Sequence, residues 1–139
     1  VFYALAMGSA GMGALVFGRW YDASGLKVLI PGLLIGAVVT PLAFLGGAAM
    51  GLAGVLLWGA ALGIHETVMD AAIAGFVPQE GRAQAFGLFS ALYGIAWFAG
   101  SALAGLLYDR SIAAMVAVSV AAALLAIIPL TQAMRALRA

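Results

Sequence analysis

Residues 28–46 read VLIPGLLIGAVVTPLAFLG, a stretch in which no side chain carries a charge. A helix needs roughly 20 apolar residues to cross the hydrocarbon layer of a bilayer. Because apolar residues occupy every face of this stretch, it lacks the polar stripe that a helix of a soluble bundle shows. The stretch therefore predicts a transmembrane helix.

The rest of the chain repeats this composition. Apolar residues make up 66% of the 139 residues and charged residues only 8%, about a third of the charge that a soluble domain carries. The charges stand in short clusters that separate long apolar runs. We predict an all-α membrane protein with a single membrane domain and five transmembrane helices, at about residues 1–17, 28–46, 50–76, 86–107 and 112–130.

Other classes fit less well. Membrane strands alternate apolar and polar residues, which these runs do not. The chain has no cysteine, so thiolate nucleophiles, disulfides and thiolate metal sites are excluded. No basic stripe indicates nucleic acid, and one histidine with few hydroxyl groups offers no nucleophile and base for an enzyme. We expect no cofactor and no metal.

The positive charges predict an orientation. Five alternating spans put all the cations except Arg110 on one side, namely Arg19, Lys27, Arg82, Arg135 and Arg138. Cytoplasmic loops carry the excess of Lys and Arg, so the amino end should lie outside and the carboxyl end in the cytoplasm. We expect the protein in the cytoplasmic membrane of a prokaryote. The chain opens on Val1 inside an apolar run, which suggests a fragment of a larger protein.

A short pattern occurs twice. Gly18-Arg19-Trp20-Tyr21-Asp22 returns in outline as Gly105-Leu106-Leu107-Tyr108-Asp109, and three predicted spans separate the copies. An odd number of crossings puts the copies on opposite faces of the membrane. Inverted three-helix repeats, common in secondary transporters, give this arrangement; chance recurrence of residues that are frequent at helix ends is the alternative.

The loop after the first span resembles the cytoplasmic signature loop of the major facilitator superfamily. Its matching residues are Gly18, Asp22, Gly25 and Lys27. Ala23 and Leu26 stand where that family has basic residues. Residues 76–87 are also similar to its connection between helices ten and eleven, with a proline, an acid and an arginine.

The resemblance implies that the chain is helices eight to twelve of a twelve-helix transporter, with the amino-terminal half missing. It also implies that Asp22 acts as a conformational latch. The alternative is that Asp22 only marks the water interface at a helix end.

The third span contains the ionisable residues His65, Glu66 and Asp70. Glu66 and Asp70 are one turn apart on one face, and His65 lies about 100° away. A carboxylate inside a bilayer costs about 3 kcal/mol on insertion scales, so it usually faces water or a partner. Glu66, with Asp70, is therefore a candidate for carrying a coupling proton or for contacting a cationic solute, and His65 is a further candidate. The alternative is a structural pair satisfied by other helices.

Two further features accompany these groups. Tyr93 and Trp97, one turn apart on the fourth span, are candidates for lining a solute cavity or for facing lipid. Pairs of small residues at one-turn spacing let helices approach closely: Gly59 and Gly63, Ser90 and Gly94, Ala96 and Gly100, and Ser101 and Gly105.

The sequence thus favours secondary active transport of a small solute by alternating access, coupled to an ion such as the proton. Its expected partners are the lipid bilayer, the solute and the missing amino-terminal half. The alternative is a membrane scaffold or assembly subunit that transports nothing.

Overall fold

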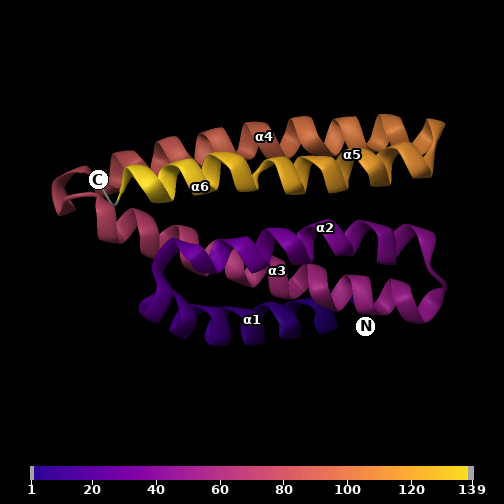
Figure 1. Ribbon diagram of the computed structural model, residues 1–139, viewed down its shortest axis with the longest axis horizontal. Coiled ribbons are helices and arrows are strands. Elements are labelled where there is room, and N and C mark those ends of the chain that lie inside the picture. Colours follow the sequence, from indigo (N-terminus) through magenta and orange to yellow (C-terminus); the bar gives the residue numbers. More distant parts are fainter. Residues whose placement is uncertain (1, 138–139) are drawn as a thin grey trace.

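The computed structural model describes residues 2–137, and within this range the chain is helical with no strand, which confirms the predicted all-α class. The long helices are α1 (Phe2–Ser24), α2 (Leu29–Leu45), α3 (Ala48–Phe76), α4 (Arg82–Arg110), α5 (Ile112–Leu125) and α6 (Ile127–Ala136). Two short 3-10 turns, Gly25–Val28 and Gln79–Gly81, precede α2 and α4. In Figure 1 the helices lie roughly along one direction, and α3 lies between α1 and α2.

Four helical stretches are long and apolar enough to cross a membrane: Tyr3–Leu45, Ala48–Phe76, Gln79–Arg110 and Ile112–Ala136. The first has 43 residues, about twice the length that a bilayer requires. Within it the chain reverses direction after α1, where Gly25 has a φ of 60°. Residues other than glycine rarely adopt that conformation. α1 and α2 therefore run in opposite directions (Figure 1).

The predicted helix ends need two corrections. Residues 18–24, predicted as a loop, continue α1 to Ser24, because the first residue that breaks the helix is Gly25. Residues 131–136, which the prediction left outside the fifth span, belong to α6, which begins after a turn at Ala126. Pro129 cannot donate the hydrogen bond that would continue α5 at this point.

Glycine allows α1 and α3 to pack in direct backbone contact. A Cβ atom at Gly59 would overlap the carbonyl of Ala6, and one at Gly63 would overlap the carbonyl of Ala10. Gly13 makes the same kind of contact from α1, since a Cβ there would lie 2.8 Å from the carbonyl oxygen of Ala60 in α3. From Ala6 with Gly59, through Ala10 with Gly63, to Gly18 with Thr67, the contacts advance along both helices, so α1 and α3 are parallel.

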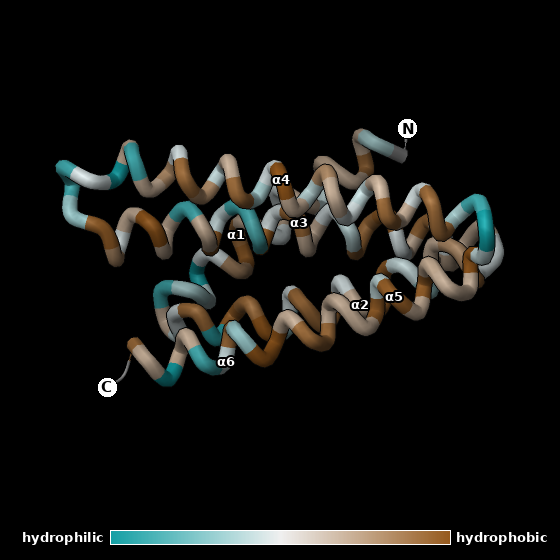
Figure 2. The backbone as a smooth tube through the Cα atoms, turned by 90° about the horizontal axis from the view of Figure 1, so that it is seen from above, coloured by the Kyte–Doolittle hydropathy of each residue, from teal (hydrophilic) through white to brown (hydrophobic). Residues whose placement is uncertain are grey.

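A small apolar core joins α3 to α2. Val28, Ile64 and Val68 are almost fully buried, and a Cβ at Gly32 would lie 3.2 Å from the Ile64 side chain. Most large apolar side chains stay exposed, among them Phe98 at 75% and Leu15 at 71%. Figure 2 shows hydrophobic colours along the helices and hydrophilic colours mainly at their ends and turns. The described helices thus present an apolar surface, which fits helices that are long and apolar enough to cross a membrane.

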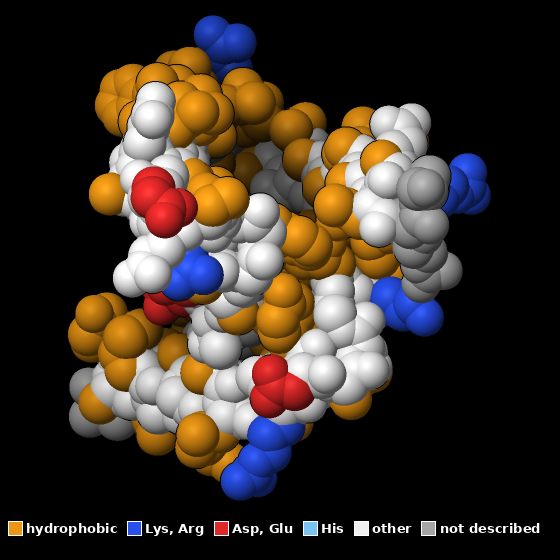
Figure 3. Space-filling model, turned by 90° about the vertical axis from the view of Figure 1, so that its left-hand side faces the viewer, with side chains coloured by type: hydrophobic (Ala, Val, Ile, Leu, Met, Phe, Trp, Pro, Cys, Tyr) orange, Lys and Arg blue, Asp and Glu red, His pale blue; other side chains and the backbone are white. Residues whose placement is uncertain are grey.

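The two ends of the bundle differ in charge. The α1–α2 turn, the α3–α4 connection and the end of α6 lie at one end (Figure 1), and they carry Lys27, Arg82 and Arg135. Figure 3 looks onto this end and shows several basic side chains. Arg110, at the end of α4, lies at the opposite end. Arg138 is outside the described residues.

Candidate functional site

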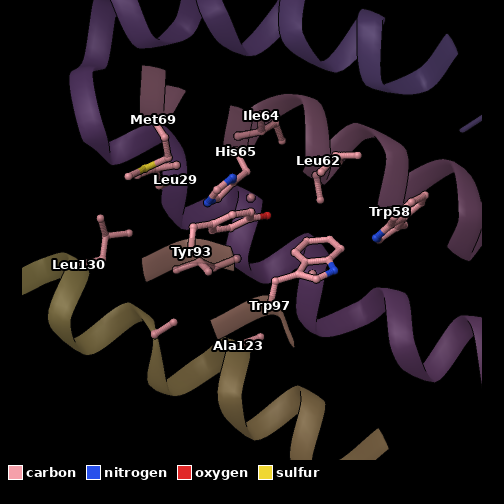
Figure 4. Close-up of a pocket in the computed structure, with 15 residues that line it drawn as sticks. Leu29, Trp58, Leu62, Ile64, His65, Met69, Tyr93, Trp97, Ala123 and Leu130 are labelled. Carbon is pink, nitrogen blue, oxygen red and sulfur yellow. The ribbon is translucent and has the colours of Figure 1, made fainter. Parts of the chain in front are cut away.

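A cavity of about 350 Å³ opens between α2, α3, α4, α5 and α6. The side chains that line it are mostly apolar or aromatic. From α3 come Trp58, His65 and Met69, from α4 Tyr93 and Trp97, and from the other helices small or aliphatic residues such as Gly32, Ala123 and Leu130. Figure 4 shows the rings of His65, Tyr93 and Trp97 around this space. Binding sites for small molecules begin at about 300 Å³, so the cavity has room for one small solute.

Stacked rings connect α3 and α4 beside the cavity. The ring centroids of His65 and Tyr93 are 4.9 Å apart with an angle of 24° between the planes. The ring centroid of Phe89 lies 5.9 Å from that of Tyr93 on one side, and the centroid of Trp97 lies 5.6 Å from it on the other. Offset aromatic pairs at these distances contribute about 0.5–1.5 kcal/mol each beyond their buried area. The stack therefore holds His65 and Tyr93 in fixed positions at the cavity wall.

The helical period explains this stack. Phe89, Tyr93 and Trp97 are four residues apart, so they lie along one face of α4. His65 comes from α3, three residues past the middle of that helix, about 4.5 Å along its axis. The aromatic face of α4 thus contacts His65, the only histidine of the chain, near the centre of α3.

The structure separates the five predicted site residues into two groups. His65, Tyr93 and Trp97 line the cavity together. Glu66 and Asp70 do not line it, and both are exposed on another face of α3. The carboxylates and the aromatic cavity are therefore neighbouring features of one helix and do not form one pocket.

The residues of the predicted latch loop take different positions. Gly18 packs against α3, where a Cβ would lie 3.5 Å from the Thr67 side chain. Asp22 is exposed in the last turn of α1, and Gly25 makes the turn itself. Lys27 lines a separate groove with residues of α6. The latch function of Asp22 stays a prediction.

Sequence reasoning missed three residues of the site. Phe89 extends the four-residue spacing of Tyr93 and Trp97 by one turn, so the spacing itself was a usable signal. Trp58 and Met69 lie seven residues before and four after His65, which also puts them on its face of the helix. Among residues 2–137, no three His, Asp or Glu side chains are placed to share a metal ion.

Comparisons with known proteins give relatives without an assigned activity. The chain is 39% identical over 128 residues to the uncharacterized protein Mb2288 of Mycobacterium bovis and, equally, to the uncharacterized protein Rv2265 of Mycobacterium tuberculosis. The match covers 92% of this chain and 31% of each relative. The chain thus spans about a third of the length of these relatives. No family model matches it, and no solved structure matches it.

Proposed function

We propose that the chain is part of a secondary active transporter of the major facilitator type, which moves a small solute by alternating access with proton coupling. The observation that carries this proposal is the pair of carboxylates, Glu66 and Asp70, exposed in the inner half of a membrane-length helix beside an aromatic cavity. In the proposed transporter both features border the path of the solute.

The exposure of the carboxylates supports a water-filled path. A carboxylate in contact with lipid at this depth costs about 3 kcal/mol on insertion scales, so such groups face cavities or partners. Glu66 lies on the helix directly next to His65, but about 100° around the axis from it. In the proposed transporter this face of α3 borders the solute path, and Glu66 takes up and releases the coupling proton.

The cavity supports a solute with an apolar ring. Its lining includes four ring-bearing residues, Trp58, His65, Tyr93 and Trp97, and no carboxylate. An ion without a counter-charge is costly to bury, whereas a flat neutral ring gains stacking contacts. The imidazole of His65 and the hydroxyl of Tyr93 supply hydrogen bonds that orient such a solute.

The arrangement of the helices supports the proposed type of transporter. The copies of the repeated pattern, which end at Asp22 and Asp109, lie near opposite ends of the bundle (Figure 1). Inverted three-helix repeats require this placement. The reversal at Gly25 divides the 43-residue stretch into two antiparallel helices, which supports five crossings of the membrane.

The test is proton movement driven by solute in liposomes that contain the full-length protein. Trapped pyranine reports the internal pH while neutral aromatic solutes are added one at a time. We expect at least one solute to drive proton flux, and Glu66→Gln to abolish the coupled flux. Glu80→Gln, which removes the same charge from the exposed 79–81 turn, should leave it unchanged. Undiminished flux in Glu66→Gln would remove Glu66 from the mechanism.

A scaffold role is the second candidate, and one observation favours it. α4 has no fully buried residue along its described length, and a Cβ at Gly94, Gly100 or Gly105 would meet no atom within 4 Å. Small residues of this kind suit close packing against another helix. A scaffold predicts that no solute drives flux and that Gly94→Leu releases a partner chain from the purified complex.

A further inference from the structure

A groove with two cations lies at the charged end of the bundle, away from the aromatic cavity. Five residues line it: Lys27, Ile30, Thr131, Met134 and Arg135. We call it the basic groove; its volume is about 250 Å³. A second pocket of about 230 Å³ shares Lys27 and Met134 with it and adds Phe76 and Leu137.

We propose that the basic groove binds the phosphate of an anionic phospholipid headgroup, held between Lys27 and Arg135. This inference does not depend on the transport function. It rests on the two positive charges of the groove, on its apolar lining residues and on its position at the ends of helices that are long enough to cross a membrane.

Charge gives the groove its preference for anions. Lys27 and Arg135 come from different elements, the turn before α2 and the last turn of α6, and both side chains are exposed. None of the five residues that line the groove is acidic. Arginine binds phosphate through two parallel N–H groups, and lysine binds it as a point charge. Two cations on one groove therefore suit a single phosphate.

The other polar groups add little. The Thr131 hydroxyl donates its hydrogen bond to the carbonyl of Ile128 at 2.8 Å, so it has no proton left for a phosphate oxygen. The amino end of α2 favours an anion and the carboxyl end of α6 disfavours one, so the helix dipoles largely offset each other. The affinity of the groove for a phosphate should therefore depend mainly on Lys27 and Arg135.

The apolar residues indicate a lipid and not a soluble phosphate. Ile30, Met134, Phe76 and Leu137 continue the groove and its neighbouring pocket as apolar surface. Arg135 lies four residues, about one helical turn, after Thr131 in α6. The helix therefore changes from apolar to charged residues where it lines the groove. A phosphate with attached acyl chains covers both the cations and the apolar surface. Basic pockets between helices on the cytoplasmic side of membrane proteins bind headgroups in this way.

The experiment measures lipid binding to the purified full-length protein by native mass spectrometry. The probes are dioleoylphosphatidylglycerol and dioleoylphosphatidylcholine, which share acyl chains and differ in net charge. We expect the anionic lipid to bind at least tenfold more tightly. Lys27→Gln and Arg135→Gln should each weaken it about fivefold, the factor that one cation near an anionic headgroup contributes, and the double variant about 25-fold.

Three controls accompany these variants. Arg19→Gln removes a cation from α1, which does not line the groove, and should change binding less than twofold. Lys27→Arg keeps the charge and should retain binding, which shows that binding depends on the charge at this position. Glycerol 1-phosphate at the lipid's concentration should not displace the lipid.

Equal losses in Arg19→Gln and Lys27→Gln would overturn the proposal, because the binding would then follow a diffuse surface potential. Equal binding of the two lipids would overturn it as well. Displacement by glycerol 1-phosphate would assign the groove to a soluble phosphate.

Discussion

Gly25 is the residue on which the path of the chain depends most. Its φ of 60° lets α1 end and α2 begin in the opposite direction. The sequence predicted Gly25 in the loop after the first span, and the structure places the turn at this residue. The sequence also predicted that the first helix ends at about residue 17, which was wrong: α1 continues to Ser24, because charged and aromatic residues such as Arg19 and Trp20 are tolerated in a helix.

Gly25→Ala should destabilise the protein by about 1–2 kcal/mol, since a Cβ is disfavoured in the left-handed conformation. The matched control is Gly47→Ala, at a turn glycine with a φ of −78° and no atom within 4 Å of the added Cβ. It should leave stability nearly unchanged. Thermal unfolding in detergent measures both variants; equal midpoints would contradict the role given to Gly25.

At the cavity, Tyr93 is the residue that contacts most of the stack. Tyr93→Leu removes its ring from between Phe89, Trp97 and His65. Loss of one aromatic contact of about 0.5–1.5 kcal/mol should weaken binding of a flat neutral probe such as 2-naphthol by about 2- to 12-fold. Quenching of tryptophan fluorescence in the full-length protein reports the binding. Tyr3→Leu, at an exposed position of α1, should bind 2-naphthol as the wild type does.

At the scale of the helix, sequence pattern predicted which segments are helical better than it predicted which of them touch. All four small-residue pairs have the same spacing, yet only Gly59 and Gly63 lie at a contact within the described chain, against α1. The glycines of α4 meet no neighbouring atom. Spacing fixes the face of a helix, whereas the neighbour on that face depends on the rest of the fold.

The α1–α3 contact gives a prediction for a pair of helices. Gly63→Ala should lower stability by about 1–3 kcal/mol, because the added Cβ meets the backbone of Ala10 and overpacking costs this much. Gly75→Ala lies on the same helix with open space around it and should be neutral or slightly stabilising, since alanine favours helix over glycine by about 1 kcal/mol.

Unfolding midpoints of the two variants in detergent test this packing. A stable Gly63→Ala protein, or equal losses at both glycines, would contradict the direct backbone contact.

For the whole molecule, the sequence predicted a helical membrane bundle because several uncharged runs, each long enough to cross a bilayer, are typical of membrane proteins. It also predicted His65, Tyr93 and Trp97 as candidates, and these residues line one cavity. It could not predict that Glu66 lies outside the cavity, because that depends on how α3 is rotated against α2 and α4. The packing of Ile64 and Val68 in the core sets this rotation.

Both the transport function and the lipid site require a chain that crosses the membrane five times, and cysteine labelling tests that topology most directly. The chain has no cysteine, so single cysteine substitutions can mark its four reversals: at Ala23 in the last turn of α1, and at Gly47, Gln79 and Ser111 between the later helices. In the full-length protein without other cysteines, a membrane-impermeant maleimide added to intact cells should label Gly47→Cys and Ser111→Cys. It should label Ala23→Cys and Gln79→Cys only after the cells are opened. Labelling of all four positions in intact cells, or of Ala23 and Gly47 from the same side, would contradict the five crossings.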